Sequence, residues 1–214
     1  MIVVLTGAPG AGKGTQADLL ALRDGFKKIS TGDALRTHIK SGTPIGLKAR
    51  AFMDEGKLVP DEVLLEILKS EFESAKGQRI LLDGYPRNRA QAEFLAHSVG
   101  QSGISACVHL DVEPSLLIGR ISGRRTCSSC GASYHVLYSP SKVAGICDRC
   151  GAETIQRPDD DEAKVRVRLE VYEKDTKPIL DFYKASGLYR RVEGTGSTED
   201  VYQRIRLLIA DVLG

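Results

Sequence analysis

A nine-residue stretch near the N-terminus constrains this chain more than any other feature. Residues 7–15 (GAPGAGKGT) match the phosphate-loop pattern G-x-x-x-x-G-K-[ST] at Gly7, Gly12 and Lys13, with Thr15 as the hydroxyl residue. The apolar run 2–5 before the loop is typical of a buried parallel strand, and the residues after it have a helical pattern. A glycine-rich turn between strand and helix directs backbone N–H groups at an anion. The stretch therefore predicts a polyphosphate site, with Lys13 on the β- and γ-phosphates and Thr15 on Mg²⁺.

Composition sets the broad class of the protein. The 214 residues are 42% hydrophobic and 27% charged, with a formal net charge of +2, as in a globular protein of one large domain with inserts. So small a net charge gives no general attraction for polyanions, and any anion site must be local. No apolar run approaches the roughly 20 residues that span a bilayer, and the N-terminal strand lacks the features of a secretory signal. We therefore expect a cytoplasmic protein with no membrane partner.

Alternating strand and helix patterns predict an α/β fold. Strands are expected at residues 2–5, 26–29, 79–82, 104–112 and 189–192. Helices are expected at about residues 15–23, 33–40, 45–55, 61–75, 89–97, 114–122, 160–184 (with a break near Pro178) and 198–213. Strands separated by helices form βαβ units, so we expect a doubly wound, parallel five-stranded sheet of the P-loop NTPase type with helices on both faces.

Two segments interrupt this alternation and divide the chain. Residues 30–59 form a helical excursion between strands, and residues 124–161 carry turn-forming residues and cysteines without a strong helical period. The remaining segments, 1–29, 60–123 and 162–214, would form a core nucleotide-binding domain. We therefore expect one core domain with two inserted ones.

Four of the five cysteines form two CxxC pairs, Cys127 with Cys130 and Cys147 with Cys150, separated by sixteen residues. This spacing is typical of a structural zinc site with four thiolate ligands, in which the metal replaces a core that so short a segment cannot build. Two disulfides or a redox dithiol are alternatives, disfavoured by the missing secretory signal and by the duplicated pair. Cys107 lies in an apolar strand and is expected to be an inert core residue.

Arginines recur at the ends of expected strands and at the edges of the second insert. They are Arg36, Arg87, Arg120, Arg124, Arg125, Arg157, Arg166 and Arg168. Phosphoryl transfer is catalysed mainly by positioning and charge stabilisation, and the planar guanidinium group matches phosphate oxygens in pairs. Asp83 ends an apolar strand, where an acidic residue would bind Mg²⁺ directly or through water; alternatively, it caps the next turn.

Six motifs together resemble the adenylate kinases, in their long form with a zinc-bearing lid. These are residues 7–16 (GAPGAGKGTQ), 30–36 (STGDALR), 56–59 (GKLV), 82–87 (LDGYPR) with Gln91, 123–125 (GRR) and 157–160 (RPDD). The resemblance covers essentially the whole chain. It implies the reaction Mg·ATP + AMP ⇌ 2 ADP by a monomer, with residues 30–59 as the AMP-binding domain and residues 124–161 as the lid.

The resemblance also implies a set of site residues. The ATP site would comprise Gly10, Ala11, Gly12, Lys13, Gly14, Thr15, Arg120, Arg124, Ser133, Tyr134 and Gly196. The AMP site would comprise Thr31, Gly32, Arg36, Lys57, Leu58, Val59, Gly84, Tyr85, Pro86, Arg87, Gln91, Arg157 and Arg168, with Thr31 and Gln91 near the base. The groups around the transferred phosphoryl would be Lys13, Arg87, Arg124, Arg157, Arg168 and the Mg²⁺-binding Asp83.

Some features depart from the family pattern, and several alternatives stay open. Cys150 stands where many lids have aspartate, and residues 193–196 (EGTG) lack a lysine that some members have. A kinase for GMP, UMP or CMP, or one using GTP as donor, would share the same motifs. A P-loop regulatory switch would not need the second, arginine-rich site. A zinc-ribbon nucleic-acid binder is disfavoured because basic and acidic residues are mixed in the insert.

Overall fold

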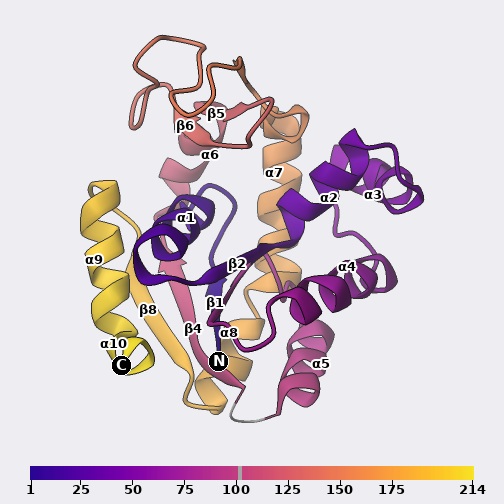
Figure 1. The fold of residues 1–214 in the computed structure, drawn as a ribbon, viewed down its shortest axis with the longest axis vertical. Coiled ribbons are helices and arrows are strands. Elements are labelled where there is room, and N and C mark those ends of the chain that lie inside the picture. The colour runs from indigo at the N-terminus through magenta and orange to yellow at the C-terminus, as the bar shows by residue number, and fades with distance from the viewer. Residues whose placement is uncertain (101–102) are drawn as a thin grey trace.

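The computed structural model describes residues 1–100 and 103–214, and a five-stranded sheet lies at its centre (Figure 1). Its strands are β1 (Ile2–Thr6), β2 (Lys27–Ser30), β3 (Ile80–Asp83), β4 (Ile104–Asp111) and β8 (Tyr189–Glu193). Every neighbouring pair is parallel, and the order is β2-β3-β1-β4-β8. The predicted parallel α/β fold is confirmed.

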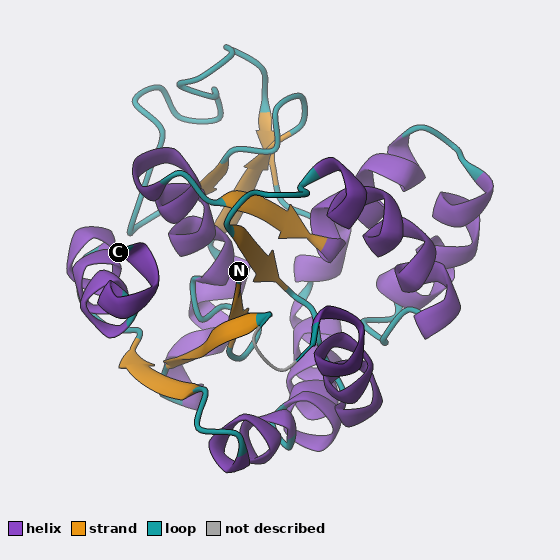
Figure 2. Cartoon of the chain, turned by 60° about the horizontal axis from the view of Figure 1, so that its bottom comes forward, coloured by secondary structure: helices purple, strands orange, loops and turns teal. Residues whose placement is uncertain are grey.

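Helices cover both faces of this sheet, as the layers in Figure 2 show. Successive residues of a strand point to opposite faces, so Val3 and Leu5 belong to one apolar cluster and Ile2 and Val4 to the other. The first cluster is completed by α1 (Lys13–Asp24) and α9 (Thr198–Leu208), and the second by α4 (Asp61–Ser74), α5 (Arg89–Val99) and α8 (Ile179–Ala185).

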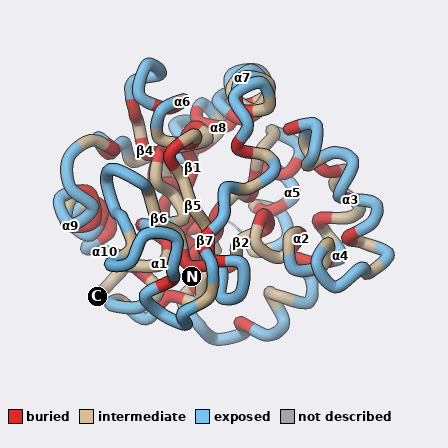
Figure 3. The backbone as a smooth tube through the Cα atoms, turned by 90° about the horizontal axis from the view of Figure 1, so that it is seen from above, coloured by how far each residue is buried: buried red, intermediate tan, exposed pale blue. Residues whose placement is uncertain are grey.

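The sheet therefore sits inside the core, where buried positions concentrate (Figure 3). The connecting helix α6 (Pro114–Ser122) leads from β4 to the second insert, and α10 (Ala210–Leu213) ends the chain. Among the described residues, the structure has no helix both long enough and apolar enough to cross a lipid bilayer.

Two excursions leave the sheet. The first consists of α2 (Thr31–Lys40) and α3 (Pro44–Asp54). The second is a small antiparallel sheet of β5 (Arg124–Cys127), β6 (Ser133–His135) and β7 (Thr154–Ile155), with β5 in the middle, followed by a short 3-10 turn at Pro158–Asp160. In Figure 1 this second excursion stands at the top of the molecule, above α6 and α7 (Glu162–Val171).

The long helix expected over residues 160–184 is three segments. After α7, residues Tyr172–Thr176 form a π-helical turn, closed by a 2.8 Å bond from Lys177 N–H to the Tyr172 carbonyl, and α8 follows. The break therefore lies before Pro178 and not at it. Proline has no N–H to continue the helical hydrogen-bond ladder, and the wider turn forms in the residues that precede it. Similarly, the helix expected over 198–213 is interrupted at Ile209.

The first helix of the helical excursion begins two residues earlier than expected, at Thr31. Ser30 is its N-cap, and the Ser30 hydroxyl accepts a 3.3 Å bond from the Asp33 N–H. Thr31 therefore takes no part in capping, and its hydroxyl donates instead to the Gly84 carbonyl at 2.9 Å. This bond joins the ends of β2 and β3.

Candidate active site

A cavity of about 720 Å³ opens where the strands of the central sheet end. Residues at or just beyond the carboxyl ends of four strands line it: Gly7 after β1, Thr31 after β2, Asp83 at the end of β3, and Gly194 after β8. Ligands of open parallel sheets bind at this edge, because the chain there leaves the sheet in loops that carry polar groups. The two excursions supply the other walls.

The phosphate loop forms one end of the cavity. Gly12, the N-cap of α1, adopts φ 98° and has no side chain to satisfy the first N–H groups of the helix. A Cβ on Gly7 would lie 2.6 Å from the Leu110 carbonyl oxygen, so a larger residue cannot replace this glycine without moving the strand. The Lys13 ammonium curls back over the loop and donates to the carbonyls of Gly7 at 2.7 Å and Ala8 at 3.0 Å.

The pKa of Lys13 follows from this enclosed position. Burial lowers it to about 7; the nearby Asp83 carboxylate raises it in part, and the charges of Arg87 and Arg168 lower it further. A phosphate group placed in the loop would reverse this balance by adding negative charge next to the ammonium. Lys13 should therefore become fully protonated when an anion binds in the loop.

Asp83 places a carboxylate beside the loop. Its side chain is largely buried at the end of β3, and Oδ2 lies 3.6 Å from where a Cβ on Gly14 would stand. Thr15, in the first turn of α1, lines the same cavity. A hydroxyl and a carboxylate next to a phosphate loop are suitable oxygen ligands for Mg²⁺.

Arginines from three parts of the chain line the same cavity. Arg87 follows β3, and its Nε donates to the Gly84 carbonyl at 2.7 Å. Burial, together with the charge of Arg168, lowers the pKa of Arg87 to about 10, which leaves it charged at neutral pH. Arg124 and Arg168 both donate to the fully buried carboxylate of Asp160, Arg124 through Nε at 2.7 Å and Arg168 through Nη1 at 3.2 Å. Asp160 thus ties the cysteine-bearing excursion to α7.

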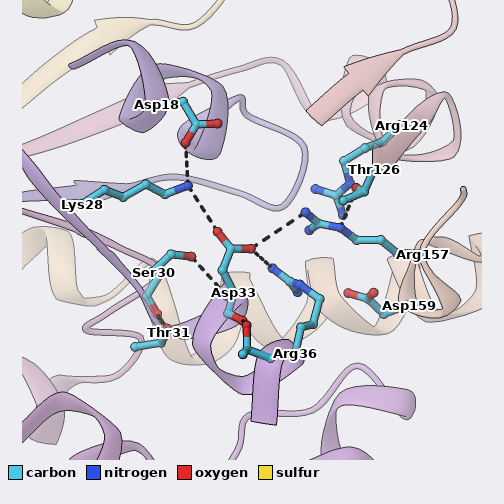
Figure 4. A network of polar contacts seen from close by, with 12 residues as sticks. Asp18, Lys28, Ser30, Thr31, Asp33, Arg36, Arg124, Thr126, Arg157 and Asp159 are labelled. Atoms are coloured by element: carbon cyan, nitrogen blue, oxygen red, sulfur yellow. Dashed lines mark hydrogen bonds and ion pairs between the residues drawn. The ribbon is translucent and has the colours of Figure 1, made fainter. Parts of the chain in front are cut away.

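A second carboxylate, Asp33, lies close to cationic side chains from three parts of the chain (Figure 4). It accepts from Arg36 at 2.6 Å and from Lys28 at 3.2 Å, and Arg157 Nη2 lies 4.0 Å away. Lys28 also donates to Asp18 on α1. Burial alone would raise the pKa of Asp33, but the charges of Arg36 and Lys28 outweigh it and hold the pKa well below its usual range. Asp33 is therefore an anion at neutral pH and neutralises guanidinium groups that a phosphate could also bind.

The four cysteines of the CxxC pairs converge in the second excursion. Their Sγ atoms all lie within 4.8 Å of one another, with Cys127 3.5 Å from Cys150 and Cys130 3.6 Å from Cys147. Tetrahedral zinc with bonds of about 2.3 Å places sulfur atoms about 3.8 Å apart, so the four thiols fit zinc. A 3.4 Å hydrogen bond from the Tyr134 hydroxyl lowers the pKa of Cys147 to about 6, which favours the thiolate that a metal requires.

Most residues expected at the nucleotide sites line this one cavity. These are Gly10, Ala11, Gly12, Lys13, Gly14, Thr15, Thr31, Gly32, Arg36, Lys57, Leu58, Val59, Asp83, Gly84, Pro86, Arg87, Arg120, Arg124, Ser133, Tyr134, Arg157, Arg168 and Gly196. The cavity thus joins residues that are far apart in the sequence, while the part each of them plays stays a prediction.

Two expected residues, Tyr85 and Gln91, do not belong to the cavity lining. Both are buried. The Gln91 amide accepts from the Arg87 N–H at 2.7 Å and donates to Asp61, and the Tyr85 hydroxyl donates to the Gln91 carbonyl at 3.4 Å. In this structure Gln91 therefore supports the Arg87 main chain.

Sequence reasoning missed several residues of the cavity. Asp33 is the centre of the ion network, and Tyr172 and Thr176 also line the cavity. Asp33 lies in the motif at residues 30–36, but an acidic residue at the start of a helix predicts only a favourable interaction with the helix dipole. Tyr172 and Thr176 lie in a segment expected to be ordinary helix, and nothing in their spacing indicates the π turn.

Comparison with known proteins agrees with this geometry. The family model described as adenylate kinase matches residues 5–188. An adenylate kinase from Syntrophobacter fumaroxidans is 46% identical over 214 residues, covering 98% of this chain and 100% of the relative. One from Thermodesulfovibrio yellowstonii is 48% identical over 210 residues (96% and 97%), and one from a Geobacillus strain is 45% identical over 212 residues (98% of each). The chain belongs to the adenylate kinase family.

Proposed function

We propose that this protein reversibly transfers the terminal phosphoryl group of Mg·ATP to AMP, giving two molecules of ADP and balancing the adenine nucleotide pool. The observation that carries this proposal is one cavity lined by two groups of cationic residues. The phosphate loop with Lys13 is one group, and Arg36, Arg87 and Arg157 are the other. A protein that bound a single nucleotide would need only the first group.

In the proposed reaction, an oxygen of the AMP phosphate attacks the γ-phosphorus of ATP. A new P–O bond forms while the bond from the γ-phosphorus to the β,γ-bridging oxygen breaks, and its electron pair leaves with ADP. No proton transfer to a side chain is required, since the phosphate is already an anion. Mg²⁺, held near Thr15 and Asp83, would neutralise phosphate oxygens, and Lys13 and the arginines would stabilise charge on the transferred group.

Residues 30–59 would act as the AMP-binding domain, residues 124–161 as the lid, and the remaining segments as the core. Arg120, Ser133, Tyr134 and the backbone at Gly196 would hold the donor adenosine, and Thr31 with residues 57–59 the acceptor. The two excursions already touch, because Lys40 Nζ donates to the Ser128 carbonyl at 3.0 Å. Their closure would exclude water, a competing nucleophile, when both substrates are bound.

The metal of the cysteine cluster is proposed to be zinc with a structural role. All four ligands would be thiolates from the protein, which leaves no open position for a substrate. Four thiols kept unpaired suit a reducing compartment, so we place the protein in the cytoplasm. One chain supplies every wall of the cavity, and we propose that it works as a monomer.

The test is ADP formation from ATP and AMP by the purified, metal-loaded protein, followed in a coupled assay with Lys13→Ala beside the wild type. We expect at least a hundredfold loss of turnover for Lys13→Ala, as is typical when a preorganised charge donor is removed. Lys184→Ala is the matched control, because Lys184 is an exposed lysine paired with Asp181 on the surface. Near-normal turnover of Lys13→Ala would remove this lysine from the mechanism. GMP, UMP and CMP as acceptors and GTP as donor define base selectivity.

A further inference from the structure

The π turn at Tyr172–Thr176 interrupts the helix that carries Arg168. In an α-helix, residues four apart are rotated by about 40° from one another, so a row at positions 168, 172 and 176 would drift off one face. A π turn has more residues per turn than an α-helix. The π turn closed by the bond from Lys177 N–H to the Tyr172 carbonyl therefore brings Thr176 back toward the face that carries Arg168. Accordingly, Arg168, Tyr172 and Thr176 all line the active-site cavity.

The last residue of the π turn, Thr176, contacts the loop that carries Arg87 directly. The Thr176 hydroxyl donates a 2.8 Å hydrogen bond to the main-chain carbonyl of Arg87. Both Thr176 and the loop at residues 84–87 are largely enclosed, and Arg87 has two further restraints, Nε on the Gly84 carbonyl and N–H on Gln91. Main chain and side chain of Arg87 are thus fixed from three directions, and one of them comes from the π turn.

The first residue of the π turn is fixed to the central sheet. His109 on β4 is buried and lies between two tyrosines, with Nε2 3.2 Å from the Tyr172 hydroxyl and Nδ1 3.1 Å from the Tyr189 hydroxyl. Burial lowers the pKa of His109, so the neutral ring donates through one nitrogen and accepts through the other. Tyrosine hydroxyls can serve either role. The turn is therefore anchored to β4 at one end and bonded to Arg87 at the other.

We propose that Thr176 is a positioning residue of the acceptor side. Its hydroxyl holds the Arg87 main chain and so aligns the Arg87 guanidinium with the transferred phosphoryl group. The π turn that presents this hydroxyl is anchored to the sheet by His109 and Tyr172. The inference rests on the proposed phosphoryl transfer, because Arg87 is assigned its role there. Thr176 itself does not touch the reacting atoms. Small displacements of an aligned charge donor are costly, since catalysis here is mostly positioning.

The experiment compares Thr176→Val, which keeps the shape and removes the hydroxyl, with Thr176→Ser, which keeps the hydroxyl. We expect Thr176→Val to lower kcat/KM for AMP about five- to tenfold, as loss of one buried hydrogen bond would. The KM for ATP should change less than twofold, and Thr176→Ser should recover most of the activity. Equal losses for both variants, or an equal rise of both KM values, would reduce Thr176 to a structural role and overturn the proposal.

A double-mutant cycle separates this inference from the proposed function. On an Arg87→Lys background, which removes the aligned guanidinium, Thr176→Val should cost less than a further twofold. A full additive loss would contradict the proposal, since Thr176 would then act elsewhere. If the wild type made no ADP, the proposed function would fail; a fully active wild type with an unimpaired Thr176→Val variant would refute the inference alone.

Discussion

The two excursions that flank the cavity are stabilised by different kinds of interaction. The helical one shares an apolar cluster in which Leu35, Ala49 and Val59 pack against Leu64 and Ile67 of α4. The cysteine-bearing one buries a cluster of Cys127, Ala132 and Cys147, while Leu137, Tyr138 and Val143 stay exposed. The helical excursion is thus ordered by packing against a neighbouring helix, whereas we propose that the cysteine-bearing one is ordered by binding a metal. Each solution makes the segment sensitive to a different perturbation.

Both excursions nevertheless deliver the same functional group. Arg36 comes from the helical excursion, and Arg124 and Arg157 from the cysteine-bearing one. The two excursions meet where Arg157 Nη2 lies 4.0 Å from the Asp33 carboxylate (Figure 4). The comparison predicts that metal loss and core truncation act on separate parts of one active site.

Metal removal should have the largest effect. We expect a chelator to lower the melting temperature by more than about 10 °C, because the four-cysteine cluster takes the place of a core in its excursion. At low temperature kcat should fall much less, since the proposed zinc has a structural role and would not contact the reacting groups. Calorimetry of metal-loaded and metal-free protein, with assays of both at low temperature, measures this. An early and equal loss of stability and kcat would give the metal a chemical role.

Truncation of the shared apolar cluster should come next. Leu64→Ala removes a buried side chain between α4 and the helical excursion and should lower the free energy of unfolding by about 2–4 kcal/mol. The same loss is expected with and without chelator, within roughly 0.5 kcal/mol, because the sites are independent. Leu22→Ala, at a leucine that is 77% exposed, is the control and should be nearly neutral. Denaturant unfolding of the wild type and of Leu64→Ala, each with and without chelator, measures the difference. Strong coupling between the variant and the chelator would contradict the separation of the two excursions.

The core differs from both excursions in its response to pH, because it contains Lys13, whose pKa in the folded protein is about 7. With a folded pKa of about 7 against about 10.4 unfolded, the unfolded chain binds more protons at Lys13 between these values. Lys13 therefore makes the unliganded protein more stable as pH rises through this window.

ATP phosphates should raise this pKa, so binding should take up nearly one proton at about pH 8.5 and almost none at about pH 6. Calorimetric titration in buffers of different ionisation enthalpy counts the protons. Lys13→Met should abolish the uptake. Uptake that is independent of pH would show that Lys13 is already charged in the empty loop.

The smallest effect is expected at Tyr134, whose hydroxyl reaches Cys147 Sγ at 3.4 Å and accepts from the Asp148 N–H at 2.8 Å. Tyr134→Phe should weaken metal binding about tenfold, as is typical for loss of a hydrogen bond to a ligand. Competition with a chromophoric chelator measures the affinity. Tyr138→Phe is the control, because Tyr138 is exposed. Equal affinities for both variants would exclude the Tyr134 hydroxyl as a support of the metal site.

Features encoded by neighbouring residues were predictable from the sequence. The phosphate loop, the buried strands and the CxxC pairs each depend on a few consecutive positions, and the structure confirms the sheet and the convergence of the cysteines. The Asp33–Arg157 contact and the Thr176–Arg87 bond were not predictable. They join segments distant in sequence, and their geometry is set by how the helices pack rather than by local pattern.

The π turn shows the same limit within one helix. The residues around Tyr172 have an ordinary helical period, and Pro178 indicated a break without giving its form or place. Its position depends on tertiary partners, namely His109 on β4 and the carbonyl of Arg87.

The central claim is that one cavity holds two nucleotides and moves a phosphoryl group between them. The most direct measurement is the formation of ADP from ATP and AMP by the purified, metal-loaded chain, with ATP alone as the reference. The account predicts rapid ADP formation with both substrates, reversal when ADP is supplied, and little hydrolysis of ATP without AMP. Failure to interconvert the adenine mono-, di- and triphosphates, or ATP hydrolysis that is indifferent to AMP, would contradict it.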